Sequence, residues 1–129
     1  MPGWVGNIEQ ETLANETFRT VVFTGGHTQL TVMSIEPGDD IGGEVHRGHD
    51  QFLRVEAGQA RVELGGGEGS PEEVHEVEDD WAVIVPSGVW HNVVNTGDEP
   101  LKVYSLYSPP EHPEGTVHRT KADALAAEH

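Results

Sequence analysis

The sequence predicts an all-β fold, a sandwich or barrel of many short strands joined by tight turns. Short runs of β-branched and aromatic residues recur along the chain, and turn-forming residues separate them at the intervals typical of such folds. Sixteen glycines and eight prolines are spread over the 129 residues rather than clustered. A chain of this length predicts one domain, with a core over about residues 18–108 and a tail over residues 109–129.

The first half of the chain predicts an arm followed by strands. The first fifteen residues show little periodicity and predict an arm or an edge strand. Residues 18–24 and 30–35 are rich in β-branched and aromatic residues between turns, which predicts two strands. Apolar and polar residues alternate over residues 59–64, a pattern typical of a half-buried strand, and the glycine-rich residues 65–71 predict a loop.

The strand expected at residues 51–57 places a glutamine in the interior. Successive side chains of a strand point to opposite faces, so Gln51 shares its face with the aliphatic residues. Arg54 and Glu56 lie on the other face, toward solvent or a subunit contact. Because burying an unpaired amide costs about 1–3 kcal/mol, Gln51 needs a partner, which a metal ion or an ordinary hydrogen bond would supply.

The second half of the chain predicts further strands and a tail. Short strands are expected at residues 74–77, 81–85, 91–94 and 101–107. The strand at residues 81–85 (WAVIV) is largely apolar, which predicts burial on both sides or at an interface. Prolines beyond Ser108 disfavour a regular strand, so this segment should cross the surface or a barrel mouth. The capping-box spacing of Thr120 and Asp123 predicts a short helix over residues 121–127.

Composition excludes several function classes. Seven basic and 23 acidic residues give a net charge of -16, which repels phosphate backbones and anionic membranes, so neither a nucleic acid nor a membrane is an expected partner. There is no apolar run of membrane-spanning length and no signal pattern, and a cytoplasmic location is expected. The absence of cysteine excludes disulfides, thiolate ligands and cysteine nucleophiles.

Two spaced motifs carry a resemblance to a known family. The first reads Gly38-x5-Glu44-x-His46-x4-Gln51-x6-Gly58, and the second reads Asp80-x5-Pro86-x-Gly88-x2-His91-x3-Asn95. Their spacing resembles the two motifs of the cupin superfamily, G-x5-H-x-H-x3/4-E-x6-G and G-x5-P-x-G-x2-H-x3-N. The resemblance implies a double-stranded β-helix, or jelly-roll, barrel. The chain also looks like small single-domain members of the mannose-6-phosphate-isomerase-like group.

The resemblance implies that Glu44, His46, Gln51 and His91 bind one divalent transition metal. Glu44 stands where the family has a histidine and Gln51 where it has a glutamate, so the set still carries one negative charge. Two nitrogen and two oxygen donors favour manganese, iron, nickel or zinc over copper. His49 or Asp50 could replace Gln51 as a ligand if the turn is wound differently, although a rim position is expected for both.

Other residues have simpler interpretations. Surface positions are expected for the four histidines that have no second ligand at a matching spacing, namely His27, His75, His112 and His118. His118 is a mild exception, because the C-terminal tail of the family can lie near the pocket. Trp90 and Tyr104 are expected in the core or an interface. Asp80, at the place of the family's glycine, needs a turn, and aspartate tolerates the left-handed conformation better than most residues.

The expected function is a metal-dependent enzyme acting on a small polar metabolite, isomerase-like or dioxygenase-like. Glu44 and His49 are the candidates for proton transfer. The alternative is a non-catalytic, small-ligand-binding or structural protein, in which the same residues hydrogen-bond one another in a vacated pocket. A homodimer is expected to form through outer sheet faces, with residues 81–85 at the interface.

Overall fold

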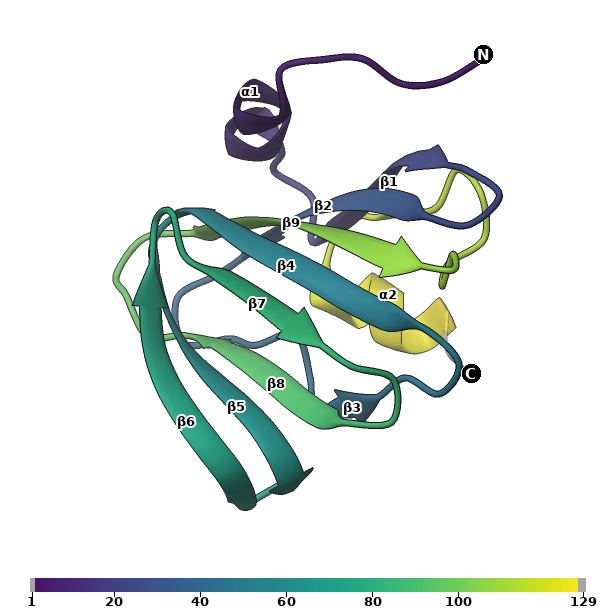
Figure 1. The fold of residues 1–129 in the computed structure, drawn as a ribbon. Coiled ribbons are helices and arrows are strands. Elements are labelled where there is room, and N and C mark those ends of the chain that lie inside the picture. Colours follow the sequence, from purple (N-terminus) through teal and green to yellow (C-terminus); the bar gives the residue numbers. More distant parts are fainter. Residues whose placement is uncertain (1, 128–129) are drawn as a thin grey trace.

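Two antiparallel sheets enclose the core in this computed structural model, which describes residues 2–127 (Figure 1). The six-stranded sheet has the order β10 (Val117–His118), β1 (Arg19–Thr24), β2 (Gln29–Ile35), β9 (Leu101–Ser108), β4 (Asp50–Ala57) and β7 (Ala82–Val85). The four-stranded sheet has the order β3 (Glu44–Val45), β8 (Trp90–Asn95), β5 (Gln59–Gly67) and β6 (Ser70–Glu78). This is the expected jelly roll, and it forms an open sandwich rather than a closed barrel.

The core draws on both sheets. Val55 of β4 and Val103 of β9 are fully buried in one sheet, and Val62 of β5 is 1% exposed in the other. Burial of each such side chain contributes about 1.5–3 kcal/mol. Because the aliphatic residues lie on the inward faces of both sheets, their burial holds the two sheets together.

Most expected strands are present, with one loop replaced by a hairpin. The glycine-rich residues 65–71 continue the ladder of β5 and β6 to the pair Gly67–Ser70, so only a two-residue turn remains. Gly66 has a φ of 68°, and a Cβ there would lie 2.3 Å from the Ser70 carbonyl oxygen. Glycine therefore allows a strand pairing where composition predicted a loop.

The N-terminal segment contains a helix, so the expectation of an edge strand is wrong. In α1 (Ile8–Ala14) the Asn7 side chain caps the helix by accepting a hydrogen bond of 3.0 Å from the Gln10 backbone N–H. The helix packs against β2, β4 and β9 (Figure 1). Glu56, expected to face solvent or a subunit, is only 6% exposed and pairs with Arg54 at 2.8 Å.

Strand β7 alternates in burial instead of being buried on both sides. Val83 and Val85 point inward, whereas Ile84 is 67% exposed and the preceding Trp81 is 50% exposed. The turn before it holds Asp80 at a φ of 76°, as expected for a left-handed position, and Arg54 contacts its carboxylate at 2.7 Å.

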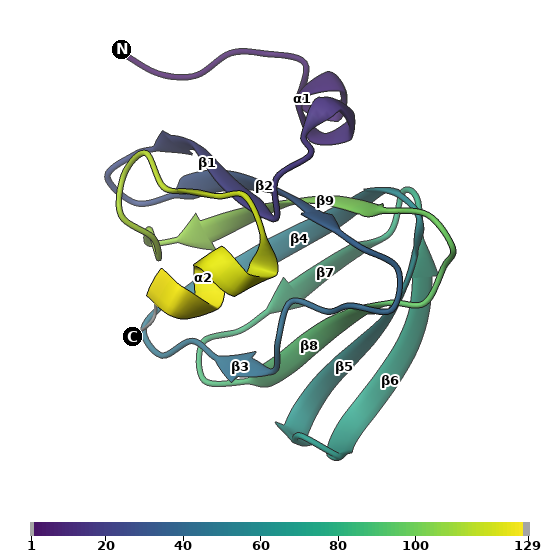
Figure 2. The ribbon, with the colours of Figure 1, turned by 180° about the vertical axis from the view of Figure 1, so that it is seen from behind.

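The tail leads into the expected C-terminal helix, α2 (Lys121–Ala127). Thr120 and Asp123 cap it reciprocally, because each backbone N–H donates to the other's side chain, at 3.3 and 3.1 Å. Figure 2 shows the tail running beside β1 before it enters α2. Within residues 2–127, neither helix has the length and apolar character needed to cross a membrane.

Candidate metal centre

Strand pairing brings three of the expected ligands together. Glu44 on β3 lies directly opposite His91 on β8, and His46 follows β3 at once. Glu44 Oε1 lies 3.2 Å from His46 Nε2 and 3.8 Å from His91 Nε2. Adjacent ligands of one ion at about 2.1 Å lie about 3.0–3.4 Å apart, so the separation of 3.2 Å suits a shared metal and the separation of 3.8 Å is slightly wider.

Backbone contacts between the two motif loops fix this arrangement. The Gly88 N–H donates to the His46 carbonyl at 2.8 Å, and the Gly48 N–H donates to Ser87 Oγ at 2.8 Å. Asp50 is exposed and accepts a hydrogen bond of 2.9 Å from the Ser87 backbone N–H. Asp50 therefore holds the loops together at the rim, the position expected from the sequence.

Gln51 points inward, as the alternation of β4 predicts. Its side chain is 2% exposed, and Nε2 donates to Ser105 Oγ at 3.3 Å. Gln51 lies opposite Tyr107 of β9, whose ring contacts the ring of His46 edge-on at a centroid distance of 5.7 Å. Because directly opposite residues of paired strands share a face, the amide lies one side chain away from the histidine cluster.

Three buried donor atoms fit a metal ion. Within the described chain, His46 Nε2, His91 Nε2 and Gln51 Oε1 are buried and have no aligned hydrogen-bond partner. Such atoms are rare in folded proteins, and an ion or water is the usual explanation. Two imidazoles, a carboxylate and an amide also match the donors that borderline transition metals accept.

The protonation of the cluster follows from its surroundings. Burial lowers the pKa of His91, which keeps the ring neutral, and its Nδ1 lies 3.3 Å from the Val89 carbonyl oxygen. If the His91 Nδ1–H donates to this carbonyl, the lone pair of His91 Nε2 faces Glu44. Burial raises the pKa of Glu44, but His46 and His91 outweigh it, so this pKa lies below its usual value. Burial lowers the pKa of His46, yet Glu44 and Glu111 raise it overall.

Glu111 is a site residue that the sequence did not reveal. Its Oε2 lies 2.5 Å from His49 Nε2 and 3.5 Å from His46 Nδ1, which places a second carboxylate beside the cluster. The rings of His46 and His49 are 4.8 Å apart, so His49 lines the cluster although a rim position was expected. In the sequence, the only indication of Glu111 is that the proline-rich segment beyond Ser108 is expected to cross the surface or the barrel mouth.

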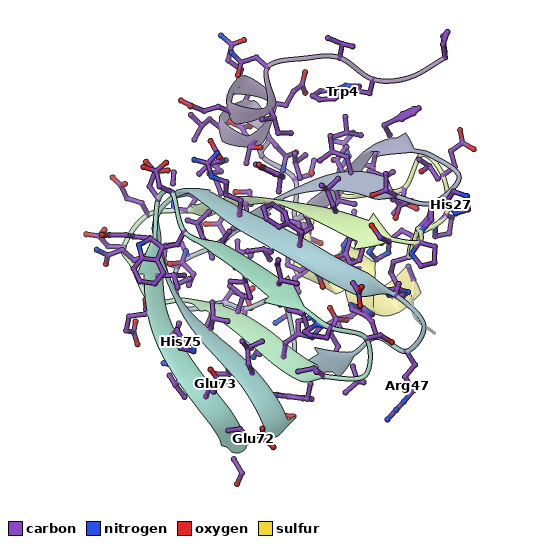
Figure 3. The ribbon with its side chains drawn as sticks, viewed as in Figure 1. Trp4, His27, Arg47, Glu72, Glu73 and His75 are labelled. Atoms are coloured by element: carbon purple, nitrogen blue, oxygen red, sulfur yellow. The ribbon has the colours of Figure 1, made fainter. Side chains whose placement is uncertain are left out.

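Of the remaining histidines, two lie at the surface as expected and one does not. His27 and His75 are exposed and point outward (Figure 3), and His75 contacts Glu73 at 2.9 Å. His112 was expected at the surface, but its ring packs edge-on against Tyr107 at 5.2 Å and its Nε2 is buried. Burial and the charge of Arg19 lower the pKa of His112 to about 4. His118 lies opposite Arg19 in the strand register.

Trp90 and Tyr104 are half-buried. Trp90 packs against the backbone of Gly43, where a Cβ would lie 2.6 Å from the indole ring. Tyr104 lies on the outer face of β9, with its ring centroid 6.2 Å from that of Phe52.

Comparison with known proteins adds a family and relatives. The model of the Cupin domain family matches residues 31–107. The chain is 54% identical, over 97% of its length, to the uncharacterized protein YrkC of Bacillus subtilis and covers 67% of it. It is 36% identical, over 88% of its length, to the uncharacterized protein L612 of Acanthamoeba polyphaga mimivirus and covers 70% of it.

A solved structure shares both sequence and fold with this chain. It is BH2720 of Bacillus halodurans, with a TM-score of 0.93 and 54% identity over 95% of this chain and 93% of the other. At this similarity, strand order and motif loops are expected to correspond along nearly the whole chain.

Proposed function

The chain belongs to the cupin family, and from its cluster of buried donor atoms we propose that it is a metal-dependent enzyme acting on a small polar metabolite. Glu44, His46, Gln51 and His91 would hold one divalent manganese, iron, nickel or zinc ion. The observation that carries the proposal is the convergence of His46 Nε2 and His91 Nε2 on Glu44 Oε1, with the unsatisfied Gln51 Oε1 buried on the neighbouring strand.

The same observation argues against a vacated pocket. In such a pocket the buried side chains would have hydrogen-bonded one another, because an unsatisfied buried polar atom costs about 1–3 kcal/mol. Across residues 2–127, His91 Nε2 and Gln51 Oε1 remain without that compensation, and His46 Nε2 has only its contact of 3.2 Å with Glu44 Oε1. A ligand that accepts their lone pairs supplies it.

When bound, a divalent ion polarises a carbonyl or hydroxyl oxygen of a substrate. His49, oriented by Glu111, would then take up and return the substrate proton that an isomerisation transfers. The His49 ring lies against His46, and its Nε2 faces the Glu111 carboxylate at 2.5 Å. A histidine oriented by a carboxylate is a common general base. This pair favours the isomerase-like form of the function, which needs a base beyond the ligands. Membership of the mannose-6-phosphate-isomerase-like group belongs to the same proposal.

Elemental analysis of the purified, untagged protein by mass spectrometry tests the proposal. The expected result is about one equivalent of a transition metal in the wild type and its loss in His46→Ala and in His91→Ala. His75→Ala is the matched control, because His75 is an exposed histidine on β6 and should leave the metal content unchanged. Circular dichroism checks that each variant remains folded.

Two results would contradict this assignment: undiminished metal in both ligand variants, or no metal in the wild type even after reconstitution. Iron as the bound metal would move the proposal from the isomerase-like to the dioxygenase-like form.

A further inference from the structure

Arg19 is a buried arginine near the proposed metal centre, and it forms no ion pair with a carboxylate of residues 2–127. Arg19, at the start of β1, is only 5% exposed, and its Nε has no hydrogen-bond partner among residues 2–127. Its recorded contacts are His118 Nδ1, 3.4 Å from Nη1, and the Phe18 ring, whose centroid is 5.3 Å from Cζ. Neither is an anion.

This arrangement differs from that of Arg54 and Arg61, two half-buried arginines of the chain. Arg54 contacts Glu56 and Asp80, and Arg61 contacts Glu63 at 3.1 Å, although both arginines are more exposed than Arg19. A buried cation is normally paired because removing a charge from water is costly. The guanidinium of Arg19 is therefore positioned to receive an anion from outside residues 2–127.

The guanidinium lines a cavity that borders the histidine cluster. The cavity has a volume of about 420 Å³, and its polar lining includes Arg19, Glu111, His112 and His118. Glu111 connects the two regions, because its carboxylate lies 3.5 Å from His46 Nδ1. A small molecule held here would reach from Arg19 toward the proposed ligands, and the volume is within the usual range for small-molecule sites.

We propose that Arg19 binds a carboxylate group of the substrate, so that the enzyme acts on a small organic acid. The inference rests on the proposed function, since it assigns the substrate class of that site. A guanidinium presents two parallel N–H groups that match a carboxylate. A neutral sugar would leave the buried charge unpaired.

The local charge favours a carboxylate over a phosphate. Arg19 contributes one positive charge to the cavity, and Glu111 contributes a carboxylate to the same wall. Burial and Arg19 lower the pKa of His112 to about 4, so this imidazole is neutral near pH 7 and adds no second cation. A carboxylate monoanion carries the one negative charge that the single cation Arg19 can pair with, whereas a phosphate dianion would bring a second negative charge close to Glu111 with no further cation to offset it.

Isothermal titration calorimetry with acetate, glycolate and inorganic phosphate tests the proposal, on both chelator-treated and metal-reconstituted protein. Arg19→Met is expected to weaken binding of both carboxylates at least about tenfold, a loss of about 1.4 kcal/mol. Arg61→Met is the matched control and should bind as the wild type does, because Arg61 is on β5 and pairs with Glu63. Arg19→Lys keeps the charge but loses the planar pair of donors, and should weaken binding less.

Thermal unfolding in buffer free of carboxylates distinguishes an anion-binding arginine from one that stabilises the fold. The two roles predict opposite changes in the melting temperature of Arg19→Met. Without an anion, Arg19→Met should melt at or above the wild-type temperature, because an unpaired buried charge has been removed. A lower melting temperature, together with no effect of carboxylates on the wild type, would overturn the proposal. Equal carboxylate affinity in Arg19→Met and Arg61→Met, or tighter binding of phosphate, would overturn it as well.

If Arg19→Met does not fold, Arg19→Lys provides the test. Unchanged carboxylate affinity in the lysine variant would refute the proposal. Metal content of the same preparations separates the two proposals. Carboxylate binding that depends on Arg19, in a protein that takes up no metal even on reconstitution, would refute the proposed function alone. Metal binding without such dependence would refute the carboxylate site alone.

Discussion

Gln51 sets the net charge of the proposed metal centre. A glutamate at this position would add a second carboxylate beside Glu44 and two imidazoles. We therefore expect Gln51→Glu to tighten divalent-metal binding at least about tenfold, as measured by titration against a competing chelator. Without metal, the same variant should melt at a lower temperature, because the new charge is buried and unpaired.

Gln59→Glu is the control for that change, since Gln59 is exposed and also lies on a strand. If Gln51→Glu and Gln59→Glu bind metal with the same affinity as the wild type, Gln51 is an ordinary core amide and not a ligand.

His112 should make the folding stability depend on pH. Its pKa is lowered from 6.5 to about 4 by burial first and by the Arg19 charge second. Between these values the unfolded chain binds a proton that the folded chain does not, so stability is present above pH 6.5 and is lost as the pH falls toward 4. Urea unfolding of wild type and His112→Gln at about pH 7 and about pH 5 should show a smaller loss in the variant.

A His75→Gln variant serves as the comparison, because His75 is exposed and should leave the pH dependence as it is in the wild type. Equal losses of stability on acidification in His112→Gln and His75→Gln would contradict the role given to His112.

At the residue scale, the sequence predicted side chains whose placement depends on local geometry. Glu44 and His46 share a face because they are two residues apart, and the alternation of β4 turned Gln51 inward. Arg19 and Glu111 were not identified, because they lie outside both motifs. Their positions depend on contacts between distant segments, such as Arg19 with His118, 99 residues away, and Glu111 with Gln29, 82 residues away, which no local pattern encodes.

At the element scale, one buried glutamine holds the tail against the sheet. Gln29 of β2 is fully buried, and its Oε1 accepts from the backbone N–H groups of Glu111 and His112, at 3.2 and 3.0 Å. Its Nε2 donates to the His112 carbonyl at 2.7 Å. These bonds fix the backbone on both sides of the Glu111 side chain and so position its carboxylate beside His46 and His49.

Gln29→Leu should therefore lower the free energy of unfolding by about 3 kcal/mol, because it leaves backbone groups of the tail unsatisfied. Urea unfolding measures this loss. Gln59→Leu, at an exposed position, should change stability by less than about 0.5 kcal/mol. Hydrogen exchange offers a second measurement, with faster exchange expected at Glu111 and His112 in Gln29→Leu. Unchanged exchange there would mean that the tail is held by other contacts.

Elements with a strong periodic or capping signal were predicted well. The strand with alternating residues at 59–64 and the capped helix at 121–127 are both present. The missed helix α1 had a weaker signal, Asn7 followed three residues later by Gln10, which matches the spacing of a helix cap. Composition predicts a loop for the glycine-rich hairpin because glycine disfavours strands in general, although here it permits close backbone contact.

At the scale of the whole molecule, the net charge and an apolar edge act in opposite directions on self-association. The charge of -16 makes two copies of the chain repel each other. Strand β7 forms one edge of the six-stranded sheet, and its Ile84 and the preceding Trp81 are 67% and 50% exposed. An exposed apolar edge strand is a common site of pairing between chains.

We therefore expect a homodimer that pairs through β7 and becomes tighter as salt screens the acidic surface. Sedimentation velocity at low and moderate ionic strength should show the dimer population rising with salt, and a standard interface would bury about 1,600 Å² in total. Ile84→Lys should shift the protein to monomers, because a charge would be buried at the contact. Leu13→Lys changes the net charge equally at an exposed residue of α1 and should leave the dimer intact. A wild type that stays monomeric at every salt concentration, or equal effects of the two lysine variants, would exclude β7 as the interface.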